Sequence, residues 1–303
     1  MSSGSGDGRR PDPATDAFVA HRNLLFTVAY EMLGSAVDAE DVLQETWLRW
    51  SGVELATVRD HRAYLVRITT RQALGRLRAL GRRKESYVGP WLPEPLLTSP
   101  DVADQVELAD SISMAMMMVL ETLAPTERAV FVLREVFALG YDEIAEAVDK
   151  TQAAVRQIAH RARAHVAARR PRGGAVSADE ARTAIAAFQR AVETGDLQGL
   201  LDLLAPDVVA LSDGGGIKQA MPRPTVGAER VGRLLAAGVA LWGPTGTAEP
   251  AQVNGHPALV LRVDGEIDVV VAMRLDEGRI TGIYSVRNPE KLTHMDRETA
   301  VSL

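Results

Sequence analysis

The chain of 303 residues is long enough for two or three compact units, and its 46% apolar and 24% charged residues are typical of a globular protein. It contains no cysteine, which excludes disulfide bonds, thiol catalysis and cysteine-ligated zinc. The absence of cysteine favours the cytoplasm. No apolar run approaches the roughly 18 residues of a membrane-spanning helix, so we expect a chain that does not span a membrane and has no membrane partner.

The net charge of −6 conceals two basic segments. Residues 59–84 contain nine Arg or Lys and one acid, and residues 150–172 contain seven Arg or Lys and no acid. Clusters of this kind are the electrostatic signature of phosphate binding. A solvated helix face without a partner is the alternative for either segment taken alone.

The first 86 residues divide into a lead-in and a helical unit. Residues 1–15 are rich in Ser, Gly, Pro and charge, and predict a disordered lead-in. Residues 16–86 predict one domain, because apolar side chains recur at helical spacing over 18–33, 38–50 and 62–80. The helix over 38–50 has an apolar side with Trp47 and Trp50, and an opposite side with the acids Asp38, Glu40, Asp41 and Glu45.

Residues 87–105 predict an extended linker, because residues 87–100 contain four prolines. This linker is unusually apolar, and Trp91, Leu92, Leu96 and Leu97 would be costly to leave in water. We therefore expect the linker to dock on another part of the chain.

A second helical domain is predicted over 106–172. Its methionines at 114–118 are suited to an irregular core. Pro125 is placed for the first turn of a helix that continues over 128–139, followed by helices over 141–148 and 152–168. The last two have the apolar pattern of a helix-turn-helix, with Thr151 as the N-cap of the second helix. A helical hairpin without a nucleic-acid partner is the alternative.

The residues that the second helix of this motif turns outward are candidate DNA ligands. Its N-terminal part would enter the major groove, where Arg156 or Gln157 could contact base edges, and Arg161, Arg163 and Arg169 would meet phosphates. The candidate ligands of this helix are Thr151, Gln152, Ala153, Arg156, Gln157, His160, Arg161 and Arg163.

The pattern changes after Gly173 and Gly174. Residues 175–303 mix helices, predicted over 178–193, 200–204 and 228–239, with strands, predicted over 208–211, 258–263, 267–274 and 280–287. Asp-Gly at 264–265 and Glu-Gly at 277–278 would join the last three strands as an antiparallel meander. We expect an α+β domain, and expect the polar residues 293–303 after it to be loosely held.

Two motifs carry a family resemblance. LAPTERAVFVLREV (123–136), YDEIAEAV (141–148) and AVRQIAHRAR (154–163) resemble region four of bacterial sigma factors, and DAEDVLQETWLRW (38–50) resembles their region two. Only a short segment separates region two from region four, and this makes the sequence similar to sigma factors of the extracytoplasmic-function type. The sequence departs from the family at Asp149-Lys150, where Gly and an apolar residue are usual, although Asp tolerates the left-handed conformation.

The resemblance implies that the chain binds core RNA polymerase, through its β′ and β subunits, and promoter DNA. The acidic helix over 38–50 would bind a β′ coiled coil with Asp38, Asp41, Glu45 and Trp47. The first basic segment would follow the −10 strand, and the loop 51–61 would hold an unstacked base. The residues implied for the −10 element are Trp50, Arg59, Arg62, Tyr64, Arg67, Arg71, Arg76 and Arg78, with a core position as the alternative for the two aromatics.

The last 129 residues, 175–303, resemble the SnoaL-like (NTF2-like) fold, an α+β cone, which a subgroup of these sigma factors has as a C-terminal extension. Three motifs match that subgroup, at 91–96, 213–216 and 288–292. They imply a regulatory contact made by Trp91, Leu92, Pro93, Leu96, Asp213, Gly214, Gly215, Asn288, Pro289, Lys291 and Leu292. From the residues alone, Asp213 before three glycines is predicted to be a turn residue.

We therefore expect a monomeric sigma factor without catalytic residues, metal or cofactor, regulated by its C-terminal domain, which could bind a small apolar ligand. One alternative is a pocket enzyme or ligand sensor fused to a DNA-binding adaptor, with Asp213, His256 and Asp268 as possible acids or bases. Another is a dimeric repressor, which would have no use for the acidic helix over 38–50.

Overall fold

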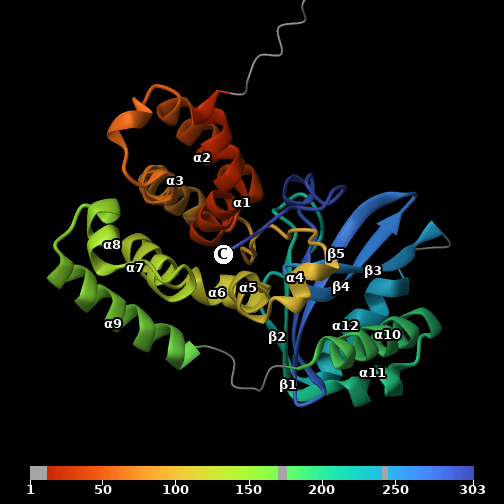
Figure 1. Cartoon of the computed structure of the whole chain (residues 1–303). Helices are drawn as coiled ribbons and strands as arrows, with labels where there is room; N and C mark the ends of the chain where they lie inside the picture. Colours follow the sequence, from red (N-terminus) through yellow and green to blue (C-terminus); the bar gives the residue numbers. More distant parts are fainter. Residues whose placement is uncertain (1–11, 170–175, 241–244) are drawn as a thin grey trace, which may run out of the picture.

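The computed structural model describes residues 12–169, 176–240 and 245–303 (Figure 1). Most of the predicted lead-in and the separator at Gly173 and Gly174 lie outside these residues. Within them, no helix is both long enough and apolar enough to cross a membrane.

The predicted three-helix unit is confirmed as α1 (Pro13–Leu33), α2 (Ala36–Trp50) and α3 (His61–Glu85). The helix α1 begins inside the predicted lead-in, because the Asp12 carboxylate caps it by accepting from the Ala14 N–H and Pro13 occupies its first turn. A short 3₁₀ turn, Leu55–Thr57, lies in the loop between α2 and α3.

The second helical unit follows the linker. Its helices are α4 (Pro100–Asp104), α5 (Val106–Ile112), α6 (Met114–Leu120), α7 (Pro125–Phe131), α8 (Tyr141–Val148) and α9 (Gln152–Arg169). The predicted helix over 128–139 instead ends in a π-helical turn, Val132–Val136. Asp149 adopts the left-handed conformation, with φ 55° and ψ 57°, so the unusual turn residue preserves the helix-turn-helix.

The C-terminal domain is α+β, as predicted. Its helices are α10 (Ala178–Thr194), α11 (Leu197–Leu203) and α12 (Ala228–Ala240), and its strands are β1 (Leu204–Asp213), β2 (Thr225–Val226), β3 (Thr247–Val253), β4 (His256–Val263), β5 (Glu266–Asp276) and β6 (Arg279–Val286). In the described residues they form one six-stranded sheet of order β2-β1-β6-β5-β4-β3. The meander from β3 to β6 is antiparallel, and β1 runs parallel to β6.

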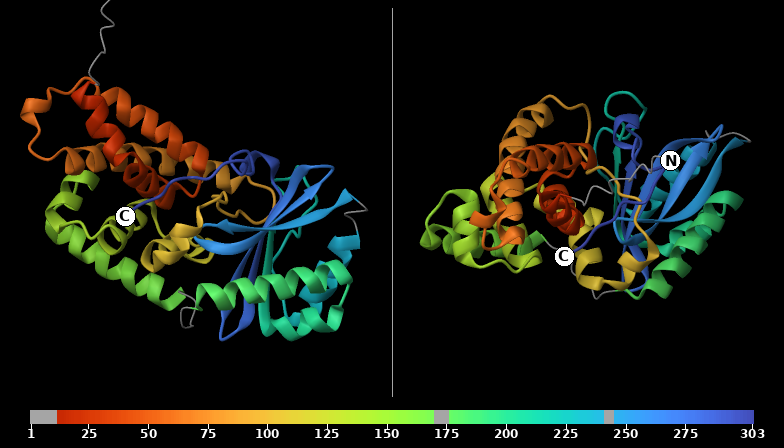
Figure 2. Two further views of the ribbon diagram at one scale, coloured as in Figure 1. Left: turned by 45° about the vertical axis from the view of Figure 1, so that its right-hand side comes forward. Right: turned by 45° about the horizontal axis from the view of Figure 1, so that its top comes forward.

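Alternate residues of the sheet face two different layers. Leu259 and Leu261 of β4 belong to a core that the helices α10 to α12 cover. Val260, between them, belongs to a second core that includes Leu92 of the linker and Met114 of α6. The sheet is thus the platform on which the N-terminal half of the chain sits, and Figure 2 shows these two layers on opposite sides of it.

The two helical units share one apolar core. It contains side chains of α1, α2 and α3 together with those of α7, α8 and α9. The helices of the first unit pack directly on those of the second, with α3 against α8 (Figure 1). The structure is therefore a closed arrangement of both helical units on the C-terminal domain.

Candidate nucleic-acid and polymerase interfaces

The outer face of α9 is free of protein cover. Val155, Ile158 and Ala159 are buried against the rest of the helical core. All eight predicted −35 residues are exposed, namely Thr151, Gln152, Ala153, Arg156, Gln157, His160, Arg161 and Arg163. The Thr151 hydroxyl caps the helix by accepting from the Ala154 N–H at 3.2 Å. The sequence therefore placed the surface of this helix correctly.

The arginines of α9 differ in how firmly the protein holds them. Arg163 bonds to Glu135 at 2.8 Å, which raises the pKa of the guanidinium, and Arg161 lies 3.7 Å from Glu127. Arg156 instead lies over the Tyr141 ring, 5.5 Å from its centroid. The arginine nearest the helix start is thus held by a ring, and the two later ones by carboxylates.

The basic side chains of α3 fall into two groups. Arg59, Arg62 and Arg78 are exposed at or near this helix. Arg67 and Arg71 instead bond to Glu146 of α8, and Arg76 pairs with Asp38 and Asp41 of α2. Half of the predicted −10 arginines are therefore engaged within the protein.

The structure contradicts the prediction that Trp50 holds an unstacked base. The side chain is 0% exposed, and its Nε1–H donates to the Ala14 carbonyl at 2.7 Å. Its ring contacts His61 and Tyr64 edge-on or tilted. Trp50 is a core residue, whereas Tyr64 is half-buried beneath the Arg67 guanidinium and remains a candidate.

The acidic face of α2 is also only partly available. Asp38 is buried and bonds to Arg76 at 2.6 Å, and Trp47 is half-buried against Phe18. Glu45 and Leu48 are exposed, Leu48 to 71%. The sequence analysis did not single out Leu48.

Asp213 is the centre of the contact between linker and C-terminal domain, and it is also the turn residue that the sequence predicts, because it accepts from the Gly215 N–H two residues on. It is 0% exposed at the end of β1. One carboxylate oxygen accepts from the Leu92 N–H at 2.9 Å and from Lys291 Nζ at 2.8 Å. The other accepts from the Tyr87 hydroxyl at 2.5 Å and from the Gly215 N–H at 3.1 Å.

The remaining motif residues close around this carboxylate. Lys291 Nζ also donates to the Leu92 carbonyl at 2.6 Å, and burial lowers the pKa of this ammonium. It lies 3.4 Å from the centroid of the half-buried Trp91 ring, which Lys84 Nζ approaches at 4.9 Å. Gly215 has φ +63°, and a Cβ there would lie 2.3 Å from the Asn288 amide nitrogen, so only glycine fits.

The linker is bonded on its other side to the first helical unit. Glu94 caps α2 with one carboxylate oxygen, which accepts from the N–H groups of Ala36 at 2.7 Å and Val37 at 3.2 Å. Its carbonyl accepts from the Tyr30 hydroxyl at 2.7 Å. Asn254 accepts from the Leu96 N–H and donates to the same hydroxyl. These three residues were missed, although a charged residue between two prolines of an apolar linker was a usable signal.

Comparisons with known proteins identify the two helical units. Residues 17–83 match the model of sigma-70 region 2, and residues 113–166 match that of sigma-70 region 4. The ECF RNA polymerase sigma factor SigJ of Mycobacterium tuberculosis is 35% identical over 289 residues, which cover 91% of this chain and 92% of SigJ. The chain belongs to the ECF RNA polymerase sigma factors.

One further relative and one solved structure extend over the C-terminal domain. A probable ECF sigma factor of the same species, SigI, is 33% identical over 291 residues, covering 95% of this chain and 97% of SigI. The crystal structure of SigJ covers 92% of this chain and 98% of its own, with a TM-score of 0.74 and 32% identity. The fold of the whole sigma factor, extension included, is therefore shared with a solved structure.

The tail of this sigma factor, residues 293–303, is not loosely held, and that expectation was wrong. The Thr299 N–H donates to the Leu97 carbonyl at 2.7 Å, and the Ser302 N–H donates to the Thr27 hydroxyl of α1 at 3.0 Å. Met295 is buried against the sheet and Val301 in the core of the helical units. Figure 2 shows the tail crossing from the sheet to the N-terminal helices.

The possible acids and bases of an enzyme are engaged with three separate sets of partners. Asp213 holds the linker, and His256 lies 3.2 Å from the Ala109 carbonyl of α5. Asp268 pairs with Lys218 at 3.0 Å and Arg287 at 2.7 Å. Among the residues that the structure describes, no group of acids and histidines has the arrangement of a metal site.

A buried glutamate of α1 gives a pH-dependent prediction. Glu31 is 0% exposed, and one of its oxygens accepts from the Ser111 hydroxyl at 2.7 Å. Burial raises the pKa of this carboxyl from 4.5 to about 8. Since the folded chain keeps the proton and the unfolded chain releases it, stability falls as pH rises from about 4.5 to about 8.

Glu31→Gln is expected to stabilise the fold at pH 7 by on the order of 1–3 kcal/mol, with little effect at pH 5. Urea unfolding at both pH values measures this, with the exposed Glu107→Gln as the control that changes neither. A gain at pH 5 as large as that at pH 7 would contradict the assignment of the proton.

Proposed function

We propose that this sigma factor binds core RNA polymerase through α2, recognises promoter DNA with α9 and α3, and is regulated by its own C-terminal domain in the cytoplasm. The observation that carries this proposal is the uncovered outer face of α9, whose eight candidate DNA ligands are all exposed. The basic charge of that face suits phosphates, and its N-terminal turn suits base edges. The relatives named above are sigma factors and match this chain over nearly their whole length, which supports the proposal.

The proposed polymerase contact uses the exposed part of α2. Glu45 would meet a basic surface of the β′ subunit, with Leu48 as an apolar neighbour, while the β subunit would contact the second helical unit. Asp38 contributes by orienting Arg76, whereas Asp41, whose side chain is 43% exposed, meets the polymerase beside Glu45. We propose a monomer when free, with any small apolar ligand held by the C-terminal domain.

The C-terminal domain would regulate initiation through the linker. Asp213 and Lys291 hold the linker on the sheet, and Glu94 attaches it to the start of the polymerase-binding helix. A movement of the linker on the sheet would therefore change the same segment that orders α2. This is the physical basis for regulation within one chain.

Run-off transcription tests the proposal, with purified core polymerase, this sigma factor and a genomic promoter library. We expect initiation from a discrete set of promoters that core polymerase alone does not use. Absence of sigma-dependent initiation from every fragment would overturn the proposed function.

Two arginines of α9 are expected to act differently on DNA. Arg156→Ala should relax the preference for the −35 sequence, by about 1–3 kcal/mol of discrimination, because Arg156 lies in the part of the helix that enters the groove. Arg161→Ala should weaken binding to all sequences alike and reduce the salt slope by about one. A salt-titrated binding assay on matched and scrambled DNA measures both, and identical behaviour of the two variants would refute the division.

A further inference from the structure

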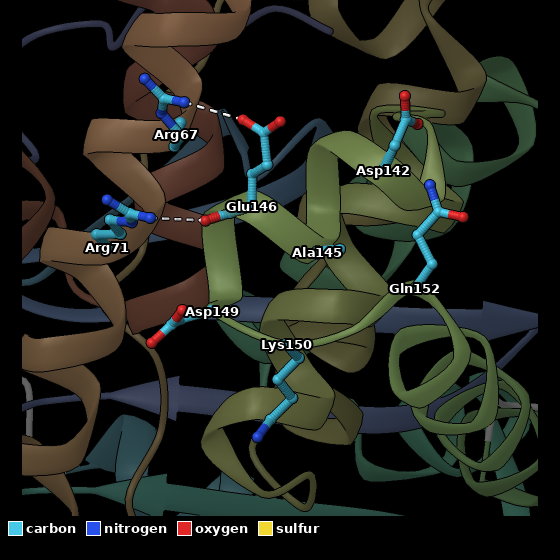
Figure 3. Close-up of a pocket in the computed structure, with 8 residues that line it drawn as sticks. All are labelled: Arg67, Arg71, Asp142, Ala145, Glu146, Asp149, Lys150 and Gln152. Atoms are coloured by element: carbon cyan, nitrogen blue, oxygen red, sulfur yellow. Dashed lines mark hydrogen bonds and ion pairs between the residues drawn. The ribbon is translucent and has the colours of Figure 1, made fainter.

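Two arginines on the DNA-binding face of α3 are bonded to the helix-turn-helix. Arg67 bonds to the Glu146 carboxylate at 2.9 Å, and Arg71 donates to the Glu146 backbone carbonyl at 2.8 Å. Figure 3 shows both side chains reaching from α3 to the same residue of α8. One residue of the region-four unit thus receives two cations of the region-two unit.

The acceptors on Glu146 resemble those of a nucleic-acid backbone. A carboxylate and a phosphate both accept charge-assisted hydrogen bonds from a guanidinium. The Glu146 carbonyl lies in the last turn of α8, where carbonyls lack helical partners and carry partial negative charge. Both arginines are therefore satisfied as they would be on two neighbouring phosphates.

The contact also lies where a DNA strand could reach it. An open depression of about 540 Å³ adjoins it, lined by Arg67, Arg71, Asp142, Ala145, Glu146, Asp149, Lys150 and Gln152. The Glu146 side chain is 66% exposed and that of Arg67 34%. Ion pairs exposed to this degree are weak and are screened by salt, so a polyanion can displace this one.

We propose that Glu146 and the end of α8 are an internal competitor of promoter DNA on α3. In the closed form Glu146 of α8 occupies hydrogen-bonding groups of Arg67 and Arg71, so the −10 strand and α8 compete for the same donors. Binding of the strand breaks the Glu146 contacts and loosens the packing of α8 on α3, and re-formation of these contacts expels the strand. This inference rests on the proposed function only in naming promoter DNA as the competing ligand.

The absence of cysteine makes a direct measurement of closure possible. Cysteines introduced as Glu54→Cys and Ala168→Cys, both at exposed positions, carry a donor and an acceptor dye on the two helical units. Energy transfer then reports the closed form in the full-length chain without DNA or polymerase. The probe for competition is a mixed-sequence pool of single-stranded oligonucleotides, since phosphate contacts are independent of sequence.

Glu146→Arg is expected to shift energy transfer away from the closed value and to raise affinity for the oligonucleotide pool about threefold or more. In the wild type, the same pool should shift transfer in the same direction, and less so at high salt. Glu107→Arg, which makes the same charge change at an exposed position of α5, is expected to leave transfer unchanged. Adding Arg67→Glu to Glu146→Arg re-forms the pair with reversed charges and should restore the wild-type transfer.

Unchanged transfer in Glu146→Arg, or failure of the reversed pair to restore it, would overturn the proposed role of Glu146 in closure. Glu146→Arg could shift the transfer, and the reversed pair restore it, in a chain that binds no single-stranded DNA. That result would support the role of Glu146 in closure and overturn the proposed DNA contact of α3. If energy transfer in the wild type keeps its closed value at a saturating concentration of the oligonucleotide pool, DNA and α8 occupy α3 together. This result would refute the competition.

Discussion

Asp213→Ala is expected to destabilise this sigma factor by about 3–5 kcal/mol, because it leaves the buried ammonium of Lys291 without its carboxylate. It also removes the acceptor of the Leu92 N–H, so the linker should separate from the sheet. Urea unfolding measures the first effect, and protease cleavage of the linker measures the second. We expect transcription to fall with the loss of the linker contact.

Two comparisons separate the buried pair from a general effect of the substitution. Asp207→Ala makes the same change at an exposed position of the same strand and should cost less than 0.5 kcal/mol or so. Adding Lys291→Met to Asp213→Ala removes the unpaired charge, and should recover part of the stability. If Asp213→Ala alone cost no more than Asp207→Ala, the carboxylate would not be the centre of the linker contact.

Removal of residues 293–303 is expected to cost about 3–5 kcal/mol, since it exposes the sites of Met295 and Val301 on two different cores. It also removes the hydrogen bonds from Thr299 to the linker and from Ser302 to α1. The sequence alone predicted a loosely held tail, whose removal would leave stability unchanged, whereas these contacts predict a loss of stability. Thermal unfolding and linker proteolysis of the truncated chain measure the effect.

A shorter deletion provides the control. Removing only Leu303, which is 42% exposed, keeps Val301 and the Ser302 hydrogen bond, and should leave stability unchanged. Val301→Asp should reproduce about half of the loss, because it disturbs the core contact without removing the tail. Equal stability of the truncated and full-length chains would mean that the tail contributes nothing to the closed arrangement.

The predicted helices and the central strands were found because their signals are local. The apolar spacing of α8 gave its bounds, Tyr141–Val148, without error. The strand β3 was missed because it contains Pro250 and several polar residues, a composition that is compatible only with a sheet edge. This strand lies at the edge because, among the strands that the structure describes, it pairs only with β4, and such pairing cannot be recognised in the segment alone.

Site residues could likewise be predicted where the signal is local, and not where it depends on distant partners. The exposed face of α9 could be derived from helical spacing, because burial of one side determines the other. The roles of Arg76 and Glu94 could not, since each depends on partners far along the chain. The contact between Asp213 and Leu92, 121 residues apart, was expected only from the family resemblance. Trp50 was predicted to contact a base because it is aromatic, but its side chain is part of the core.

The cap that Glu94 places on α2 has a thermodynamic consequence. A side-chain cap stabilises the first turn of a helix by about 1 kcal/mol, so departure of the linker favours fraying of that turn. Binding free energies at two coupled sites are reciprocal. A partner that requires an ordered first turn in α2 will therefore bind the linker-docked form more tightly, and its binding will raise the affinity of the linker for its own site by the same factor.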